Sequence, residues 1–319
     1  MALNPISWNQ GGGKLTGDLA LTQMLSQEIH MLLSDTASIR NSGYVEYSGS
    51  INSTGAAAVQ YRLVGLNGRD LFRDAGTEIS DESANMDDLT DDSATITVAR
   101  HYLIRELGDL AQMVSYGSPS IDPFVLAEDM SKSYEAKFMS KVCTAAAGFT
   151  TIKGNNTDKF STDLFFESML SLERSDTDRG APPPYALIMH PKSLGELRDS
   201  LRNETSNVIA MAPATLEMMK TKGHGYAGNL LGVDIFRSSF VTESGSAKEN
   251  FMIARGALAY ADGAPTIIGA SDLLPMQDAK LIVEFDRKPA SAISRIIGHM
   301  WCGIAVVRQT NGVLCKAIA

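Results

Sequence analysis

Cysteine is scarce in this sequence, which has three among 319 residues: Cys143, Cys302 and Cys315. Their odd number argues against a disulfide framework, and the absence of any CxxC pair argues against a cysteine-rich zinc site. Free cysteine packs like a small hydrophobic residue. We therefore expect three buried thiols and folding in a reducing cytoplasm.

Long apolar runs are also missing, because none approaches the roughly 20 residues that cross a bilayer. The first residues, MALNPISWNQGGGK, have neither the basic start nor the apolar core of a secretory signal. With 44% hydrophobic and 20% charged residues, the composition is typical of a soluble protein with one large domain or two smaller ones. No membrane partner is expected.

The sequence lacks the common catalytic motifs. The run GGGK at 11–14 is not a phosphate-binding loop, because Trp8 stands where that motif needs glycine and Leu15 where it needs Ser or Thr. Neither GxSxG nor HExxH occurs, and the acids at 87–92 lack the DxDxDG pattern of a calcium loop. We expect no catalytic residue, cofactor or metal site, and keep an acidic hydrolase with an unrecognised site as an alternative.

Positive charge is absent from one segment. Between Asp74 and Ala99 there are eight acids and no Lys or Arg, so the other residues hold 29 acids (37 minus 8) against 28 bases. No lysine at all occurs between Lys14 and Lys132. The net charge of -9 therefore belongs to this segment, and nothing resembles the basic stripe of a protein that grips phosphates.

Two runs rich in β-branched and aromatic residues, 56–65 and 94–107, enclose this acidic and turn-rich stretch and predict strands. Loops this long are uncommon inside compact domains. The stretch is either a solvated loop or part of a two-stranded arm that leaves the body and is ordered by contact with another subunit. We favour the arm, with all of 56–107 leaving the body.

The strongest helix signal covers 122–147. Asp122 is a good N-cap, Pro123 suits the first helical position, and Gly148 is a stop. The helix would be about 35–40 Å long. Its apolar residues recur at a mean spacing of 3.6: Phe124, Ala127, Met130, Tyr134, Phe138 and Val142. Its other face carries Lys132, Lys137 and Lys141.

The remaining pattern mixes helices and strands without regular alternation, which favours an α+β fold over a doubly wound sheet. Asn311-Gly312, between two apolar runs, predicts a hairpin. We expect further helices over 17–35, 160–175, 192–201 and 215–220, and strands over 185–191, 232–241, 250–263, 280–287 and 295–319.

In order and character these segments resemble the Hong Kong 97-type major capsid proteins of tailed bacteriophages, over nearly everything after residue 17. The segments that carry the resemblance are the loop 56–107, the helix 122–147, YALIMHPKSLGELRDSL, GYAGNLLGVDIFRSSFV, ARGALAYADG, VEFDR and WCGIAVVRQTNGVLCKAI. The resemblance implies an N-terminal arm (1–43), an extended β-hairpin loop (44–107), a peripheral domain with a long spine helix (108–154 and 276–319) and an axial domain (155–275).

The same resemblance implies a structural, non-enzymatic role. Copies would assemble in the host bacterial cytoplasm into hexamers and pentamers of an icosahedral virion shell around double-stranded DNA, which they meet by non-specific proximity. Implied partners are a scaffolding protein, a portal and a decoration protein. Some relatives weld subunits through a lysine on the extended loop, and because this loop has none we expect no such isopeptide cross-link.

The charge pattern suggests a subunit interface. We expect the acidic arm of one subunit to lie over the helix of a neighbour, near Lys132, Lys137 and Lys141, and to set the register there. The arm's acids are Asp81, Glu82, Asp87, Asp88, Asp91 and Asp92. An encapsulin-type compartment would give a similar pattern, and a tail or decoration protein is a further alternative.

Overall fold

The computed structural model describes residues 39, 42–51, 58–65, 90–108, 123–173, 181, 183–203, 212–213, 218, 222, 225–263, 281–288, 291 and 293–318. Helices and strands follow one another irregularly within these ranges, so the expected mixed α+β class is confirmed. The helix predicted over 17–35, and all but Met218 of the one over 215–220, lie outside the described residues.

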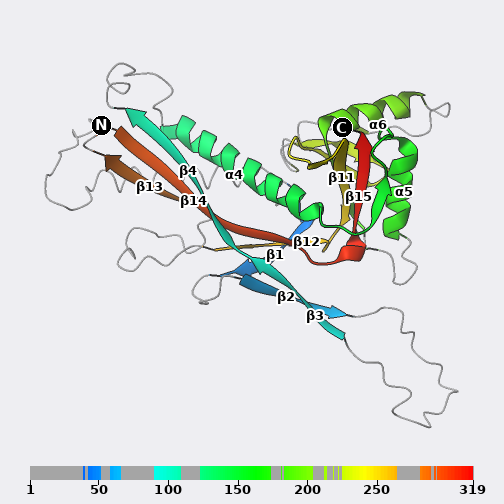
Figure 1. The fold of residues 1–319 in the computed structure, drawn as a ribbon, viewed down its shortest axis with the longest axis horizontal. Coiled ribbons are helices and arrows are strands. Elements are labelled where there is room, and N and C mark those ends of the chain that lie inside the picture. Colours follow the sequence, from blue (N-terminus) through cyan, green and yellow to red (C-terminus); the bar gives the residue numbers. More distant parts are fainter. Residues whose placement is uncertain are drawn as a thin grey trace, which may run out of the picture.

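The long helix α4 (Pro123–Ala146) runs along one half of the molecule (Figure 1). As predicted, its apolar stripe is buried at Met130, Tyr134, Phe138 and Val142. Met130 and Tyr134 of this stripe lie against a five-stranded sheet. The C-terminal half of α4 reaches a core that lies between this sheet and an eight-stranded sheet. There Phe138 and Val142 belong to one cluster with buried residues of both sheets.

The five-stranded sheet has the order β1-β12-β14-β13, with β4 also paired to β14. Its strands are β1 (Val45–Ser50), β4 (Ala99–Gly108), β12 (Leu258–Asp262), β13 (Leu281–Lys288) and β14 (Ile293–Val306). Because alternate side chains of a strand point to opposite faces, Arg105 of β4 faces α4 and binds Asp129 of that helix at 2.8 Å.

The eight-stranded sheet has the order β5-β15-β11-β6-β9-β8-β7, with β10 paired to β11. Its strands are β5 (Ile152–Gly154), β6 (Tyr185–Met189), β7 (Ala212–Pro213), β8 (Tyr226–Leu230), β9 (Val233–Arg237), β10 (Glu243–Ser244), β11 (Ala247–Ala254) and β15 (Gly312–Ile318). Helices α5 (Thr162–Glu173) and α6 (Pro191–Asn203) cover one face (Figure 1). The core with α4 covers the other, so β6 is buried on both faces and has a continuous apolar sequence.

A two-stranded hairpin, β2 (Ala58–Gly65) with β3 (Thr90–Thr97), leaves the body (Figure 1). The excursion is shorter than the predicted 56–107, because Val98 divides the second run: β3 pairs with β2, whereas β4 lies in the five-stranded sheet. The base of the hairpin also packs on its own body. Ile96 is fully buried in a cluster that includes Ala259, Ala261 and Val307.

The hairpin predicted at Asn311-Gly312 is wrong. β14 and β15 belong to different sheets, and a 3-10 turn, Gln309–Asn311, joins them. Gly312 has an extended backbone (φ −137°) and serves close packing instead, since a Cβ there would come within 2.1 Å of the Phe149 ring. Asn311 is buried and donates its side-chain N–H to the Arg255 carbonyl at 3.1 Å.

The three thiols are buried as expected. None of the helices in the described ranges combines the length and apolarity needed to cross a membrane.

Candidate subunit-contact site

The three lysines predicted to meet a neighbour lie on α4 in different settings. Lys132 is exposed and forms an ion pair with Glu128, one turn earlier in the same helix, at 2.5 Å. Lys137 is exposed and Lys141 is half-buried. Among the described residues neither Lys137 nor Lys141 has an acidic partner within ion-pair distance. The lysines are therefore not equivalent, because only Lys132 is neutralised within its own helix.

A cavity of about 370 Å³ lies where α4 crosses the five-stranded sheet. Its walls come from β4 (Arg100, His101, Tyr102 and Leu103), from α4 (Met130, Ser133, Tyr134 and Lys137) and from β14 (Gly298 and Met300). Gly298 pairs with Leu103 across the β4–β14 ladder and has no side chain to fill the space. The Arg100 side chain points to the opposite face from Arg105, where it bonds His299 Nδ1 at 3.1 Å. The cavity thus combines apolar walls with one cationic side chain on the α4 side, Lys137.

The electrostatic environment of this cavity is positive. Burial lowers the pKa of His101, and the nearby charges of Lys141 and Lys137 lower it further. The buried Nε2 atom of His101 has no hydrogen-bond partner. Burial raises the pKa of Cys302 to about 11, with the same two lysines opposing the rise. The half-buried His101 and the buried Cys302, on different strands, therefore both lie in the field of Lys137 and Lys141.

Of the six predicted acids, the structure describes two, Asp91 and Asp92. Asp91 and Asp92 lie in β3, where their backbones pair with Val64 and Leu63 of β2. Asp81, Glu82, Asp87 and Asp88 lie outside the described residues. Contact between the acids and the α4 lysines of a neighbour stays a prediction.

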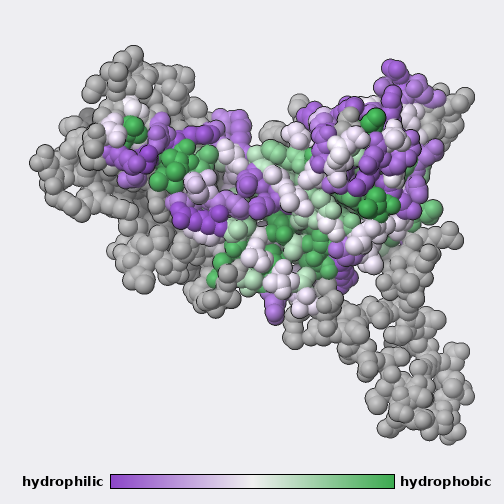
Figure 2. Space-filling view, in the orientation of Figure 1, coloured by the Kyte–Doolittle hydropathy of each residue, from purple (hydrophilic) through white to green (hydrophobic). Residues whose placement is uncertain are grey.

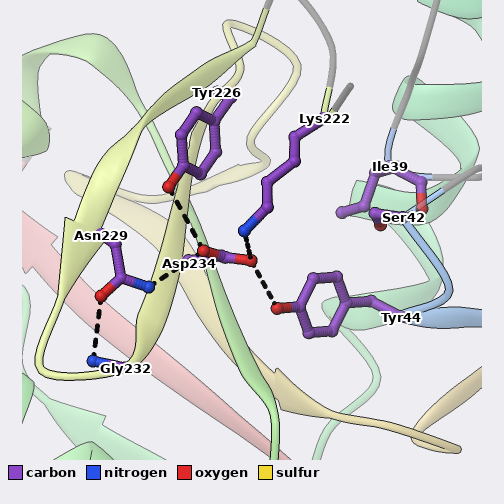
Figure 3. A network of polar contacts seen from close by, with 8 residues as sticks. All are labelled: Ile39, Ser42, Tyr44, Lys222, Tyr226, Asn229, Gly232 and Asp234. Carbon is purple, nitrogen blue, oxygen red and sulfur yellow. Dashed lines mark hydrogen bonds and ion pairs between the residues drawn. The ribbon is translucent and has the colours of Figure 1, made fainter. Parts of the chain in front are cut away.

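A second polar site surrounds the buried carboxylate of Asp234 on β9 (Figure 3). Its Oδ2 accepts hydrogen bonds from the Tyr44 hydroxyl at 2.7 Å and from Lys222 Nζ at 2.6 Å. Its Oδ1 accepts from Asn229 Nδ2 at 3.0 Å and from the Tyr226 hydroxyl at 3.3 Å. One carboxylate thus joins the segment entering β1, the Lys222 segment and strand β8.

The pKa values at this site follow from its geometry. Burial alone would raise the pKa of Asp234, but the hydrogen bonds from Lys222, Asn229 and Tyr44 outweigh burial and leave the pKa below its usual value. Burial, followed by the charge of Asp234, raises the pKa of Tyr226 to about 12. The pKa of Tyr44 is raised for the same reasons, with burial the larger cause. The carboxylate therefore stays charged and the phenols stay protonated at neutral pH.

The turn after β8 completes this cluster. Leu231 (φ 51°) and Gly232 (φ 84°) both have positive φ, as a two-residue hairpin turn of type I′ requires. The Gly232 N–H donates to Asn229 Oδ1 at 3.0 Å. The side-chain amide of Asn229 therefore binds the turn through its oxygen and Asp234 through its nitrogen (Figure 3).

Comparisons with known proteins agree on the fold. The capsid of Ralstonia phage GP4 is 11% identical over 86% of this chain and 86% of that chain, with a TM-score of 0.56. An encapsulin complex from Synechococcus elongatus is 10% identical over 100% and 96%, with a TM-score of 0.54. The head of a Helicobacter pylori bacteriophage is 10% identical over 85% and 87%, with a TM-score of 0.52. This chain has the fold of capsid and encapsulin proteins. No protein-family model and no curated protein matches its sequence.

Two features of these sites were missed at the sequence level. The cavity residue His101 approaches Lys137 only through the packing of β4 on α4, for which the sequence has no local signal. Asp234 does have a local signal in the sequence, because it is a single acid inside the apolar run VDIF. An acid in such a run implies a buried charge that has hydrogen-bond or ion-pair partners. Within the described ranges, no three His, Cys, Asp or Glu side chains are grouped so that they could hold a metal ion.

Proposed function

We propose that this chain is the major capsid protein of a tailed bacteriophage, of the Hong Kong 97 type. Its role is structural: copies assemble into hexamers and pentamers of an icosahedral head that encloses double-stranded DNA. The observation that carries the proposal is the layout shared with the phage GP4 capsid over 86% of both chains. In this chain α4 packs on a sheet of long strands, a hairpin leaves that sheet, and a second sheet carries two helices.

In this proposal the chain has a peripheral and an axial domain. The peripheral domain (108–154 and 276–319) contains α4, β13 and β14, and the axial domain (155–275) contains α5, α6 and β6. The sheets cross these bounds, because β1, β4 and β12 join the five-stranded sheet and β5 and β15 join the eight-stranded one. Subunits are held without a loop-lysine cross-link, since no lysine lies between Lys14 and Lys132. The proposed partners are a scaffolding protein, a portal and a decoration protein. The subunits assemble in the bacterial cytoplasm and are then part of the virion.

The hairpin is the element we assign to contact between subunits. Its connecting segment is acidic and contains no Lys or Arg between Asp74 and Ala99, whereas α4 exposes Lys132 and Lys137. Exposed ion pairs contribute only about 0–1 kcal/mol each. These charges would therefore set register, while buried apolar area supplies the affinity.

An encapsulin-type compartment is the second candidate, favoured by the likeness to the Synechococcus elongatus encapsulin complex over 100% of this chain and 96% of that one. The two candidates differ in what the shell contains. A phage head holds DNA, whereas a compartment holds protein cargo.

The proposal is tested by purifying particles from the organism that produces this chain and analysing their contents. We expect fast-sedimenting particles that protect double-stranded DNA of uniform length from nuclease. Particles that hold an enzyme and no protected DNA would favour the compartment. A chain that sediments as a monomer at every concentration, with or without a scaffolding partner, would contradict both.

A further inference from the structure

We propose that the cavity between α4 and β4 binds a medium-chain fatty acid, with its carboxylate beside Lys137 and its alkyl chain along Leu103 and Met130. The inference goes beyond the proposed function. It concerns a ligand of the single chain, and it applies to a phage head and to an encapsulin-type compartment alike.

The two ends of the cavity are set by how β4 lies along α4. Arg105 of β4 binds Asp129 of α4 at 2.8 Å, so this part of β4 lies beside the first turns of the helix. His101, four residues earlier on the same face of β4, instead lies in the field of Lys137. Leu103 stands between Arg105 and His101 on that face. The cavity therefore has a cationic end at His101 and Lys137, and it becomes apolar from Leu103 onward.

The apolar end has room for an alkyl chain. Leu103 pairs with Gly298 across the β4–β14 ladder, and Gly298 has no side chain to occupy the space. Met130 and Tyr134 of α4 form the opposite wall. From Met130 to Lys137 the helix rises by about 10 Å, which suits a chain of medium length. The volume of about 370 Å³ lies within the usual range of ligand pockets.

The cationic end lacks a counter-charge within the described part of the chain. There Lys137 is exposed and has no acid within ion-pair distance. The acid next to the cavity on α4, Asp129, is bound to Arg105. The Nε2 atom of His101 is buried and has no hydrogen-bond partner, so the tautomer with its proton on Nε2 can donate to a carboxylate. A carboxylate at this end would thus pair with Lys137 and satisfy His101.

Charge and shape together decide the class of ligand. A cationic amphiphile would be repelled by Lys137 and Lys141, and a small anion would leave the apolar walls unfilled. One cation with one hydrogen-bond donor matches a monoanion better than a doubly charged phosphate. Figure 2 shows hydrophilic residues along the face of α4 in view, so a headgroup beside this helix stays close to a polar surface. A single-chain monocarboxylate meets all of these conditions.

Calorimetric titration of the purified full-length chain with decanoate tests the inference. We expect saturable binding of one decanoate per chain. Each methylene removed from water changes the Kd by about fourfold, so octanoate, which is two methylenes shorter, should bind about fifteenfold more weakly. Decyltrimethylammonium has the same chain with the opposite charge and should not bind. Binding of decyltrimethylammonium as tight as that of decanoate would overturn the site.

A substitution that fills the cavity locates the binding. Ser133→Leu places a larger side chain in the cavity and should weaken decanoate binding at least tenfold. Ser140→Leu is the matched control, because Ser140 is a half-buried serine of the same helix outside the walls given for the cavity. Decanoate should raise the midpoint of thermal unfolding of the unsubstituted chain and of Ser140→Leu, but not of Ser133→Leu.

A charge series tests the headgroup position without changing the cavity walls at its apolar end. Lys137→Gln should weaken decanoate binding about twofold to fivefold and leave the binding of decanol, which has no charge, unchanged. Lys132→Gln is the control, because Lys132 is already paired with Glu128 and does not line the cavity. This series decides the question if Ser133→Leu does not fold.

The outcomes separate the ligand site from the proposed function. Three results would overturn the site: no saturable binding of decanoate, equal binding by Ser133→Leu and Ser140→Leu, or equal effects of Lys137→Gln and Lys132→Gln. Each of them leaves the shell function standing, because that function is judged by particle formation and by the contents of the particles.

Discussion

At the residue scale, the carboxylate of Asp234 holds together parts of the chain that are far apart in sequence. Tyr44, which leads into β1, and Lys222 both bind one oxygen of this carboxylate, and Asn229 binds the other (Figure 3). Hydrogen bonds to a charged group are the stronger ones in proteins. Asp234 therefore fixes the start of β1 against the eight-stranded sheet.

We predict that Asp234→Asn lowers the free energy of unfolding by about 1.5–3 kcal/mol at neutral pH, because Lys222 and Tyr44 lose a charged acceptor. The folded pKa of Asp234 lies below its ordinary value of 3.8, so this contribution is present above about pH 4 and is lost as the pH falls through the folded pKa. Urea unfolding of the unassembled chain at pH 7 and pH 3 measures it.

The control for this substitution is Asp199→Asn. Asp199 and Arg202 form an exposed pair on α6, with side chains 71% and 80% accessible, so its removal should change the unfolding free energy little. An equal loss from both substitutions, or a loss from Asp234→Asn that is undiminished at pH 3 relative to pH 7, would show that the charge of Asp234 is not the cause.

Two glycines should respond in opposite directions to alanine. At Gly312 a Cβ would overlap the ring of Phe149, so Gly312→Ala should lower the unfolding free energy by at least about 1–3 kcal/mol through overpacking. At Gly195, inside α6, nothing lies within 4 Å of the added atom, and Gly195→Ala should raise it by about 0.5–1 kcal/mol.

Thermal unfolding of both glycine variants checks this prediction. Phe149→Leu should restore part of the stability lost in Gly312→Ala, because a smaller side chain leaves room for the Cβ. If Gly312→Ala were as stable as Gly195→Ala, the close approach of Phe149 would not be the reason for glycine at this position.

At the scale of elements, the hairpin β2–β3 is anchored by its base. Ile96 is fully buried among Val59, Ala259 and Val307, so the hairpin is fixed to its own body at one end while the rest extends away. The base therefore fixes the direction in which β2 and β3 leave the body.

We predict that Ile96→Ala costs about 2–5 kcal/mol of stability, since it leaves a cavity at the hairpin base. Hydrogen exchange of the β2 and β3 amides should speed up more than that of α5. Thr95→Ala, at the exposed neighbouring position on the same strand, is the control and should change exchange little. Equal protection of β2–β3 in Ile96→Ala and the unsubstituted chain would show that the base does not anchor the hairpin.

The elements that sequence predicts best are those whose signals are local. α4 was predicted over 122–147 and spans Pro123–Ala146, because a proline start, a 3.6-residue apolar period and a glycine stop all lie in the segment itself. β6 was predicted from a continuous apolar run, which both of its buried faces require. These features depend on no distant partner.

The failures arose where distant contacts decide the outcome. Asn311-Gly312 has the composition of a hairpin turn, yet Phe149 and Arg255 use these residues for packing and a hydrogen bond, and β15 joins another sheet. The run 94–107 appeared to be one strand, but Val98 divides it between two sheets. In the candidate site the sequence predicts the lysines but not His101, because its approach to α4 depends on tertiary packing.

At the scale of the whole molecule, the two large sheets share one core. The C-terminal half of α4 contributes Phe138, Val142 and Ala146 to a cluster that also contains Leu258 of β12 and Leu314 of β15. Such a shared core resists rotation of one sheet against the other. The hairpin, in contrast, meets the body only at its base, which suits an element that binds another copy.

The central claim is that copies of this chain build a closed shell. Electron microscopy of the purified protein, alone and with a scaffolding partner, tests it most directly. We expect closed particles of uniform size whose surface resolves into rings of six and five subunits. A compact monomer under every condition, with the hairpin folded against its own α4, would contradict it.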